Sequence, residues 1–193
     1  LLDKGIISDK QYGFEKNKSA EMALLRIRDT IISNIEEKKL TIGIFLDFRK
    51  AFDSIKHEIL LNKLHVCGIR GAASEIMNSY LDSQLQYTCL QDYSSDKSSI
   101  FYGVPQGSIL GPLLLIAYIN DIVNIPLTDE MIMYADDTNV FFSGADLQEL
   151  EVTANSWLKE LHQWLYVNQL NLIAKKTKFT VFCSKNKEMS YDV

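Results

Sequence analysis

The sequence predicts an α+β domain in which an antiparallel sheet has helices packed on one face. Two observations indicate the sheet. TIGIFLDF (41–48) is β-branched and apolar almost throughout, and EMIMYADDTNVFFSG (130–144) reads as a strand, a tight turn and a second strand. A third observation is that helical and strand-like segments lack the strict alternation that a parallel sheet requires. We therefore expect a central hairpin beside a separate buried strand.

Helices are expected where apolar residues recur at helical spacing. Ser19 can cap the first one, whose apolar positions run from Leu24 to Ile35. Ser54 can cap a second, with Gly68 as its stop. In chain order, the expected helices cover about 19–39, 54–66, 72–81, 108–123 and 147–165. Further strands are expected over 85–90, 99–104 and 178–183.

Composition and charge exclude several classes of protein. Hydrophobic residues make up 47% of the 193 residues, which excludes a disordered chain. The net charge of −5 argues against a simple nucleic-acid-binding module, which is usually basic. The charge is unevenly placed, because residues 101–160 hold nine acids and one lysine, whereas residues 161–193 hold five lysines and two acids. This pattern suits a metal site beside the path of a polyanion, and it suits solvated helix faces equally well.

The sequence does not predict secretion or membrane insertion. The longest apolar run, 109–119, is too short to span a bilayer and contains Gly111 and Pro112. The chain opens without a charged-then-apolar leader, and its three cysteines are far apart without metal-ligand spacing. We therefore expect an intracellular protein of the cytoplasm and nucleus, with reduced cysteines and no membrane partner.

Three aspartates form the first candidate site. Asp136 and Asp137 lie side by side at the predicted hairpin turn, where two like charges between apolar runs need a counter-charge. Asp47 ends the most apolar strand, and strand pairing would bring it close to Asp136. Carboxylates on adjacent strand ends form the oxygen-rich cage that magnesium favours. Two such ions, roughly 3.5–4 Å apart, can activate an attacking oxygen and stabilise a leaving one. The alternative for each aspartate is a solvated turn or cap.

The segment GVPQGSILGP (103–112) is a second candidate. Gly103 and Gly107 allow the backbone to approach a ligand closely, and Pro105 stiffens the turn. Gln106 offers an amide and leads into a helix N-terminus that suits an anion. The alternative is a loop that starts a helix and binds nothing.

These segments together resemble a known family. FLDFRKAFD (45–53), GVPQGSILGP and YADD (134–137), in that order, resemble the palm motifs of reverse transcriptases, most closely those of jockey-like non-long-terminal-repeat retrotransposons. The resemblance extends upstream to QYGFEKNKSAEMAL (11–24) and downstream to the W-L-x-x-N-x-L-x-L-x-x-K-K-T pattern (164–177), so it covers nearly the whole chain.

The resemblance implies a right-hand polymerase palm with part of the fingers. Residues from about 1 to 40 would be a fingers segment and those from about 41 to 193 the palm, without the thumb and outer fingers. The implied activity is RNA-directed DNA polymerisation, in which a primer 3′ hydroxyl attacks a deoxynucleoside triphosphate at a site with two magnesium ions, or manganese in their place. The implied partners are an RNA template, a DNA primer, dNTPs and the rest of a retrotransposon polyprotein with its endonuclease and thumb.

The resemblance also assigns roles to single residues. Asp47, Asp136 and Asp137 take the metal-binding and catalytic positions. Lys176 matches a lysine that protonates the leaving pyrophosphate, although a solvated lysine is an equal alternative.

A second set of matches concerns the substrate. Phe52, which follows Lys50 and Ala51 in the substrate-binding segment, matches an aromatic residue that lies under the sugar. The alternative is that Phe52 is a core residue that packs beneath the sheet. Gln106 and Gly107 match the loop that lines the nucleotide and the template.

Three positions depart from the family pattern. Glu15 stands where arginine is usual, Ala20 where threonine is usual and Ile173 where asparagine is usual. The charge reversal at Glu15 would weaken contacts with phosphate. Two other functions remain open: an RNA-directed RNA polymerase palm, and an inactive or domesticated palm that binds nucleic acid. The isolated segment is expected to be inactive, because polymerisation needs template and primer held against the site.

Overall fold

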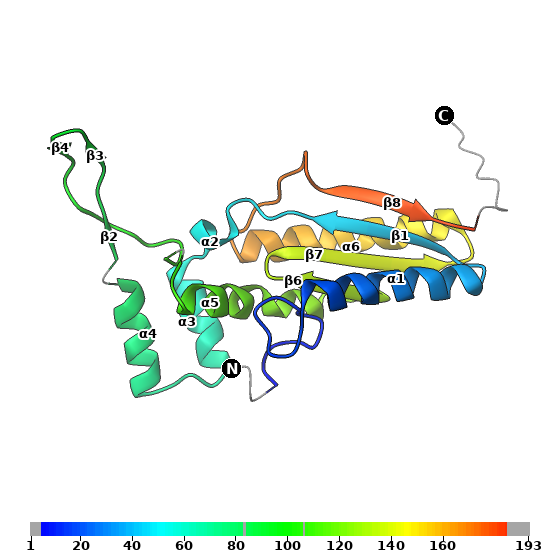
Figure 1. The fold of residues 1–193 in the computed structure, drawn as a ribbon, viewed down its shortest axis with the longest axis horizontal. Coiled ribbons are helices and arrows are strands. Elements are labelled where there is room, and N and C mark those ends of the chain that lie inside the picture. The colour runs from blue at the N-terminus through cyan, green and yellow to red at the C-terminus, as the bar shows by residue number, and fades with distance from the viewer. Residues whose placement is uncertain (1–4, 83, 106, 185–193) are drawn as a thin grey trace.

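A four-stranded antiparallel sheet forms the centre of the computed structural model, which describes residues 5–82, 84–105 and 107–184 (Figure 1). The strands run in the order β6 (Glu130–Tyr134), β7 (Asp137–Gly144), β1 (Leu40–Leu46) and β8 (Lys178–Phe182). β1 pairs with β7 over its whole length, from Leu40 opposite Gly144 to Leu46 opposite Thr138. The expected hairpin and the expected buried strand are therefore confirmed as neighbours.

The main hydrophobic core lies on one face of this sheet. α6 (Leu147–Val167) lies against that face and places Trp157 edge-on to Phe142 of β7, with the ring centroids 6.0 Å apart. α5 (Leu110–Ile119) is buried on almost every side, which explains why its sequence is apolar throughout. Because burial of apolar surface contributes roughly 25 cal/mol per Å², this layer is the main source of stability for the sheet.

A helix also covers the other face, which the sequence did not predict. α1 (Ala20–Glu36) lies on the opposite side of the sheet from α6 (Figure 1). Phe141, Ile132 and Phe45 project from this second face and pack in a smaller cluster with α1. These side chains alternate with those of the main core along their strands. Both faces of the sheet are therefore apolar, and each face needs a layer that covers it. The predicted cap of this helix is confirmed, since the Ser19 hydroxyl accepts the Met22 N–H.

Short helices and an arm separate β1 from α5. α2 (Ala51–Ser54), α3 (His57–Val66) and α4 (Ala72–Asp82) follow β1 in order. The arm, residues 84–102, contains four strands of two residues each and extends away from the sheet together with α4 (Figure 1). These strands are β2 (Leu85–Gln86), β3 (Cys89–Leu90), β4 (Tyr93–Ser94) and β5 (Ser98–Ser99).

Several element boundaries differ from the sequence prediction. Ser54 ends α2 instead of capping α3, because the buried Ile55 is extended and separates the two helices. The helix expected over 108–123 ends at Ile119 and continues as the 3₁₀ helix η2 (Asn120–Asn124). The strand expected over 99–104 is reduced to β5 and one isolated bridge, because backbone groups at Gly103 and Val104 bond to the α2 region instead.

The edge of β6 is covered by residues from the start of the chain. The Tyr12 N–H donates to the Met133 carbonyl at 2.8 Å, and the Met133 N–H donates to the Lys10 carbonyl at 2.9 Å. These bonds join segments more than a hundred residues apart.

Within the described part of the chain, no helix is both long and apolar enough to cross a membrane.

Candidate active site

Asp136 and Asp137 lie at the turn between β6 and β7. Tyr134 pairs with Asp137, so the turn itself consists only of Ala135 and Asp136. Ala135 has a φ of 54°, the left-handed conformation that non-glycine residues rarely adopt. Asp136 is half-buried and Asp137 is exposed. The predicted strand, tight turn and strand are confirmed, but the turn lies one residue earlier than expected, because Asp137 is already the first residue of β7.

Asp47 follows β1 directly and reaches the same edge of the sheet. The last β1–β7 pair joins Leu46 to Thr138, so the next position on each strand is Asp47 on one side and Asp137 on the other. Adjacent antiparallel strands therefore bring the two carboxylates to one place although ninety residues of sequence separate them. The expected neighbourhood of Asp47 and the YADD turn is present.

Backbone pairing also brings Lys176 to this edge. The Ile173 N–H donates to the Asp47 carbonyl at 2.9 Å, and the Arg49 N–H donates to the Asn171 carbonyl at 2.7 Å. The turn that follows places the Lys176 ammonium 3.2 Å from Oδ2 of Asp47. The Lys176 side chain is 64% exposed and that of Asp47 is 32% exposed, so water screens this ion pair.

An open pocket of about 350 Å³ lies over these groups. Asp47, Asp137 and Lys176 line it from the sheet side, and α1 forms the opposite wall. That wall consists of Ala20, Ala23, Leu24 and Ile27. The sequence motifs gave no indication that α1 borders the site. Ala20, one of the three departures from the family pattern, is therefore part of the pocket wall.

The electrostatics of the site favour a bound cation. Although Asp137 is exposed as a residue, partial desolvation of its carboxyl group raises its pKa, the negative charges of Asp136 and Asp47 raise it further, and Lys176 lowers it. This direction agrees with the repulsion that the sequence predicts for three clustered carboxylates. Oxygen ligands of this kind fit a hard divalent cation. In the described ranges, however, no three Asp, Glu, His or Cys side chains are arranged as a complete metal-binding group.

The residues expected to bind the nucleotide lie one turn beyond β1. Lys50 has a φ of 47° and precedes α2, while the Ala51 side chain is buried. Phe52 is partly buried and packs against the main core. Its carbonyl accepts the Val104 N–H at 2.9 Å, which joins the two predicted motifs, 45–53 and 103–112, directly.

Two hydrogen bonds of the Ser108 hydroxyl fix the glycine-containing loop at the start of α5. The Ser108 hydroxyl donates to the Pro105 carbonyl at 2.7 Å and accepts the Gly111 N–H at 2.9 Å. Gly107 has a φ of +81° and open space around it, so a glycine is required there for conformational reasons. Gln106 lies outside the described residues. Tyr102, Gly103, Val104 and Pro105 line a second pocket, of about 750 Å³, that includes residues of the arm.

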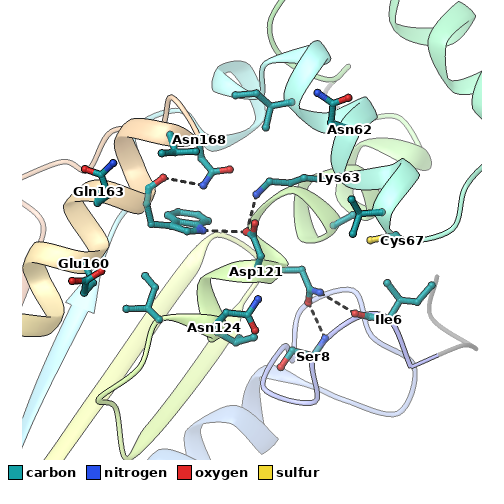
Figure 2. Close-up of a pocket in the computed structure, with 18 of the residues that line it drawn as sticks. Ile6, Ser8, Asn62, Lys63, Cys67, Asp121, Asn124, Glu160, Gln163 and Asn168 are labelled. Carbon is teal, nitrogen blue, oxygen red and sulfur yellow. Dashed lines mark hydrogen bonds and ion pairs between the residues drawn. The ribbon is translucent and has the colours of Figure 1, made fainter.

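Another pocket contains none of the three candidate-site aspartates in its lining. It has a volume of about 930 Å³ and lies between α3, η2 and α6 (Figure 2). At its centre Lys63 donates to Oδ1 of Asp121 at 2.7 Å, and the Trp164 indole N–H donates to the same oxygen at 3.1 Å. Burial is the main cause that lowers the pKa of Lys63 and raises that of Cys67. This network joins three elements and contains none of the predicted site residues.

Comparisons with known proteins identify the family. The model of the family "Reverse transcriptase (RNA-dependent DNA polymerase)" matches residues 1–191, which include the antiparallel sheet, its acidic strand ends and the glycine-containing loop. The chain belongs to this family. Reverse transcriptases generally use divalent metal ions.

Individual relatives agree with this assignment. The chain is 28% identical over 182 residues to the RNA-directed DNA polymerase from mobile element jockey of Drosophila melanogaster, covering 91% of this chain and 20% of the relative. It is 26% identical over 173 residues to the probable RNA-directed DNA polymerase from transposon BS of the same organism, covering 82% of this chain and 19% of the relative. The chain thus spans about a fifth of these relatives. It is homologous to the polymerases of non-long-terminal-repeat retrotransposons.

The fold has a solved counterpart. A structure of telomerase from Candida tropicalis in complex with a fragment of telomeric RNA superimposes with a TM-score of 0.68 at 13% identity, covering 93% of this chain and 32% of that one. At this level of identity the likeness concerns the fold alone. The predicted palm architecture is confirmed.

Proposed function

We propose that this chain carries the nucleotidyl-transfer centre of an RNA-directed DNA polymerase, extending a DNA primer on an RNA template with dNTPs. The observation that supports it most directly is the register of β1 and β7, which brings Asp47 beside Asp137 and the Asp136 turn. Adjacent carboxylates in a half-exposed pocket suit a reaction in which negative charge is transferred between phosphate and hydroxyl oxygens. The remainder of a retrotransposon polyprotein would hold the template and the primer.

Asp47, Asp136 and Asp137 are the residues that would hold the metal, for which we propose Mg²⁺. The bound ions would supply Lewis-acid stabilisation of the oxygen charges that develop during transfer. Until a metal binds, Lys176 balances part of the charge on Asp47 from 3.2 Å. In the reaction the Lys176 ammonium is well placed to give a proton to the departing pyrophosphate, because its exposure lets it leave Asp47.

The substrate-side residues have supporting geometry as well. Phe52 is the ring we propose under the sugar of the incoming nucleotide, and its carbonyl bond to Val104 holds it against the 103–112 loop. A ring that packs on the core cannot easily move aside, so a 2′-hydroxyl would meet steric overlap there and lose its hydrogen bonds to water.

Primer extension by a complete element that carries this segment tests the proposal. Asp136→Asn should reduce extension by about a hundredfold to a thousandfold, as expected for the loss of one preorganised charged group. Asp92→Asn, on the exposed arm, is the matched control and should extend normally. Primer–template binding by both variants should stay within a few-fold of the original protein. Undiminished extension by the Asp136 variant would refute the proposal, and binding without any extension by the original protein would favour a non-catalytic nucleic-acid-binding palm.

A further inference from the structure

Gln11 is almost fully buried, with 1% of its surface exposed, and it lies against the turn of the candidate site. Its side-chain Oε1 accepts the Ala135 N–H at 2.9 Å, and its Nε2 donates to the Ala135 carbonyl at 3.2 Å. The same Oε1 also accepts the Gly13 N–H at 2.7 Å. One amide therefore satisfies both backbone polar groups of the residue that precedes Asp136.

This arrangement answers a need that the turn itself creates. Ala135 has the left-handed φ of 54°, which costs of order 1 kcal/mol or more for a residue with a Cβ. As part of a two-residue turn, Ala135 lies outside the β6–β7 pairing and is itself buried. Buried backbone groups without partners are strongly unfavourable. The Gln11 amide removes that penalty only while Ala135 keeps this conformation, so it selects one geometry for the turn.

Gly13 shows how closely the two segments approach. A Cβ added there would lie 2.2 Å from the backbone nitrogen of Ala135, and no side-chain rotation can relieve a contact between backbone atoms. Only glycine therefore fits where the N-terminal segment crosses the turn.

The segment that carries Gln11 is itself fixed in place. The Lys18 ammonium donates to the carbonyls of Asp9 and Gln11, the latter at 2.8 Å, and lies 5.0 Å from the centre of the Tyr12 ring. The loop is thereby closed upon itself, and its bonds to Met133 attach it to β6. A rigid loop of this kind can transmit a fixed position to the turn.

We propose that Gln11 is a positioning residue that holds the Ala135–Asp136 turn in the geometry that presents Asp136 and Asp137 to the substrate. The expected effect of Gln11 on catalysis rests on the proposed function of that turn. Its effect on the conformation of the turn does not. The competing explanation is that Gln11 merely adds stability to the edge of β6. The two explanations differ in whether loss of the Gln11 side chain loosens the turn more than the rest of the sheet.

Amide hydrogen exchange of this chain, followed by NMR, tests the structural part. Gln11→Met preserves the volume of the side chain and removes its hydrogen bonds. The Ala135 amide should then exchange about tenfold faster or more, while the Val140 amide in the middle of the sheet should keep its rate. Gly13→Ala should accelerate exchange of Ala135 in the same way, because the added Cβ forces the loop that carries Gln11 away from the turn. Gln148→Met, on the exposed side of α6, should change neither amide. Unchanged exchange of Ala135 in Gln11→Met would overturn the proposal.

Steady-state kinetics of the complete element tests the catalytic part. Gln11→Met should lower kcat for primer extension by about tenfold or more with the KM for dNTP within a few-fold, because a misplaced group weakens the transition state more than the ground state. Gln11→Glu would place a second acceptor against the Ala135 carbonyl and a charge in a buried site, so its kcat should fall at least as far as that of Gln11→Met.

The control is Ala154→Gly, which destabilises the buried side of α6 far from the turn. If Ala154→Gly lowers kcat as much as Gln11→Met at a matched loss of thermal stability, the positioning role is refuted. If the original protein does not extend primers, the proposed function fails, and the exchange rates still decide the structural part.

Discussion

Replacing Lys63 by methionine removes an ammonium group that joins three elements of the fold. This group donates to Oδ1 of Asp121 at 2.7 Å (Figure 2). It also donates to the Tyr118 carbonyl at 2.5 Å and lies 5.3 Å from the centre of the Trp164 ring. The side chain is 16% exposed. Methionine keeps most of the apolar stem, so the change tests the charge and its hydrogen bonds more than packing.

The expected loss of unfolding free energy follows from the groups that no longer have Lys63 as a partner. A buried hydrogen bond that involves a charged group contributes about 1.5–3 kcal/mol, and the Tyr118 carbonyl loses such a donor. Asp121 is 44% exposed and keeps the Trp164 N–H, so water and the indole compensate most of its charge. Its unpaired carboxylate should therefore add no more than about 1 kcal/mol. Lys63→Met should lower the free energy of unfolding by roughly 1.5–4 kcal/mol.

The pH dependence gives a second, independent signature. Burial lowers the pKa of Lys63 below its usual 10.5, although the bond to Asp121 works in the opposite direction. At a pH between the lowered pKa of Lys63 in the folded protein and its usual 10.5, the unfolded chain binds more protons than the folded one. The unfolding free energy of the original protein therefore rises with pH in this range. The methionine variant lacks this rise, and the gap between the two proteins should widen as pH approaches 10. Above pH 10 the comparison is mixed with Tyr118, because burial raises the pKa of its phenol to about 12.

Urea unfolding followed by circular dichroism measures both effects. Lys159→Met, on the exposed side of α6, is the matched control and should change the free energy by less than about 0.5 kcal/mol. The double variant Lys63→Met with Asp121→Asn should lose less than the sum of the single variants, since the two groups are paired. Equal midpoints for Lys63→Met and Lys159→Met would refute this account of the network.

Three further predictions concern the site and its support. Phe52→Val in a complete element should lower discrimination against ribonucleotides by about tenfold or more, measured as the ratio of kcat/KM for the two sugars, and unchanged discrimination would contradict the proposed place of the ring. Asp137→Asn should raise the melting temperature at pH 7. The corresponding gain in unfolding free energy should be at most about 1 kcal/mol, because Asp137 is exposed, and it should vanish near pH 3. The sign follows because its raised pKa makes the ionised carboxylate unfavourable in the folded state above the usual value of 3.8, and a lower melting temperature at pH 7 would be the contrary result. Tyr118→Phe should cost about 1–3 kcal/mol in urea unfolding, because its hydroxyl donates to the buried Asn168 carbonyl at 2.6 Å, and an unchanged midpoint would show that this bond is dispensable.

Local elements of this protein could be read from the sequence wherever the pattern itself contains the cause. The hydroxyl of Ser19 and the helical stripe after it predicted α1 with its cap, and the uninterrupted apolar run 41–48 predicted β1. YADD between two apolar runs predicted a tight turn, although the turn consists of Ala135 and Asp136 and Asp137 belongs to β7. The boundaries around Ser54 and 108–123 were wrong, because the buried, extended Ile55 separates α2 from α3 and the end of the second segment is a 3₁₀ helix.

The candidate site needed the tertiary structure, because its members meet only through long-range pairing. The register of β1 against β7 decides that Asp47 faces Asp137, and the pairing of 171–173 with 47–49 brings Lys176 to Asp47. No local pattern specifies either, since a shift of one residue would turn every side chain to the other face. The sequence by itself determined which residues could perform the chemistry. The packing of the chain decided which of them lie together, and it placed Gln11, 124 residues away, against the turn that holds Asp136.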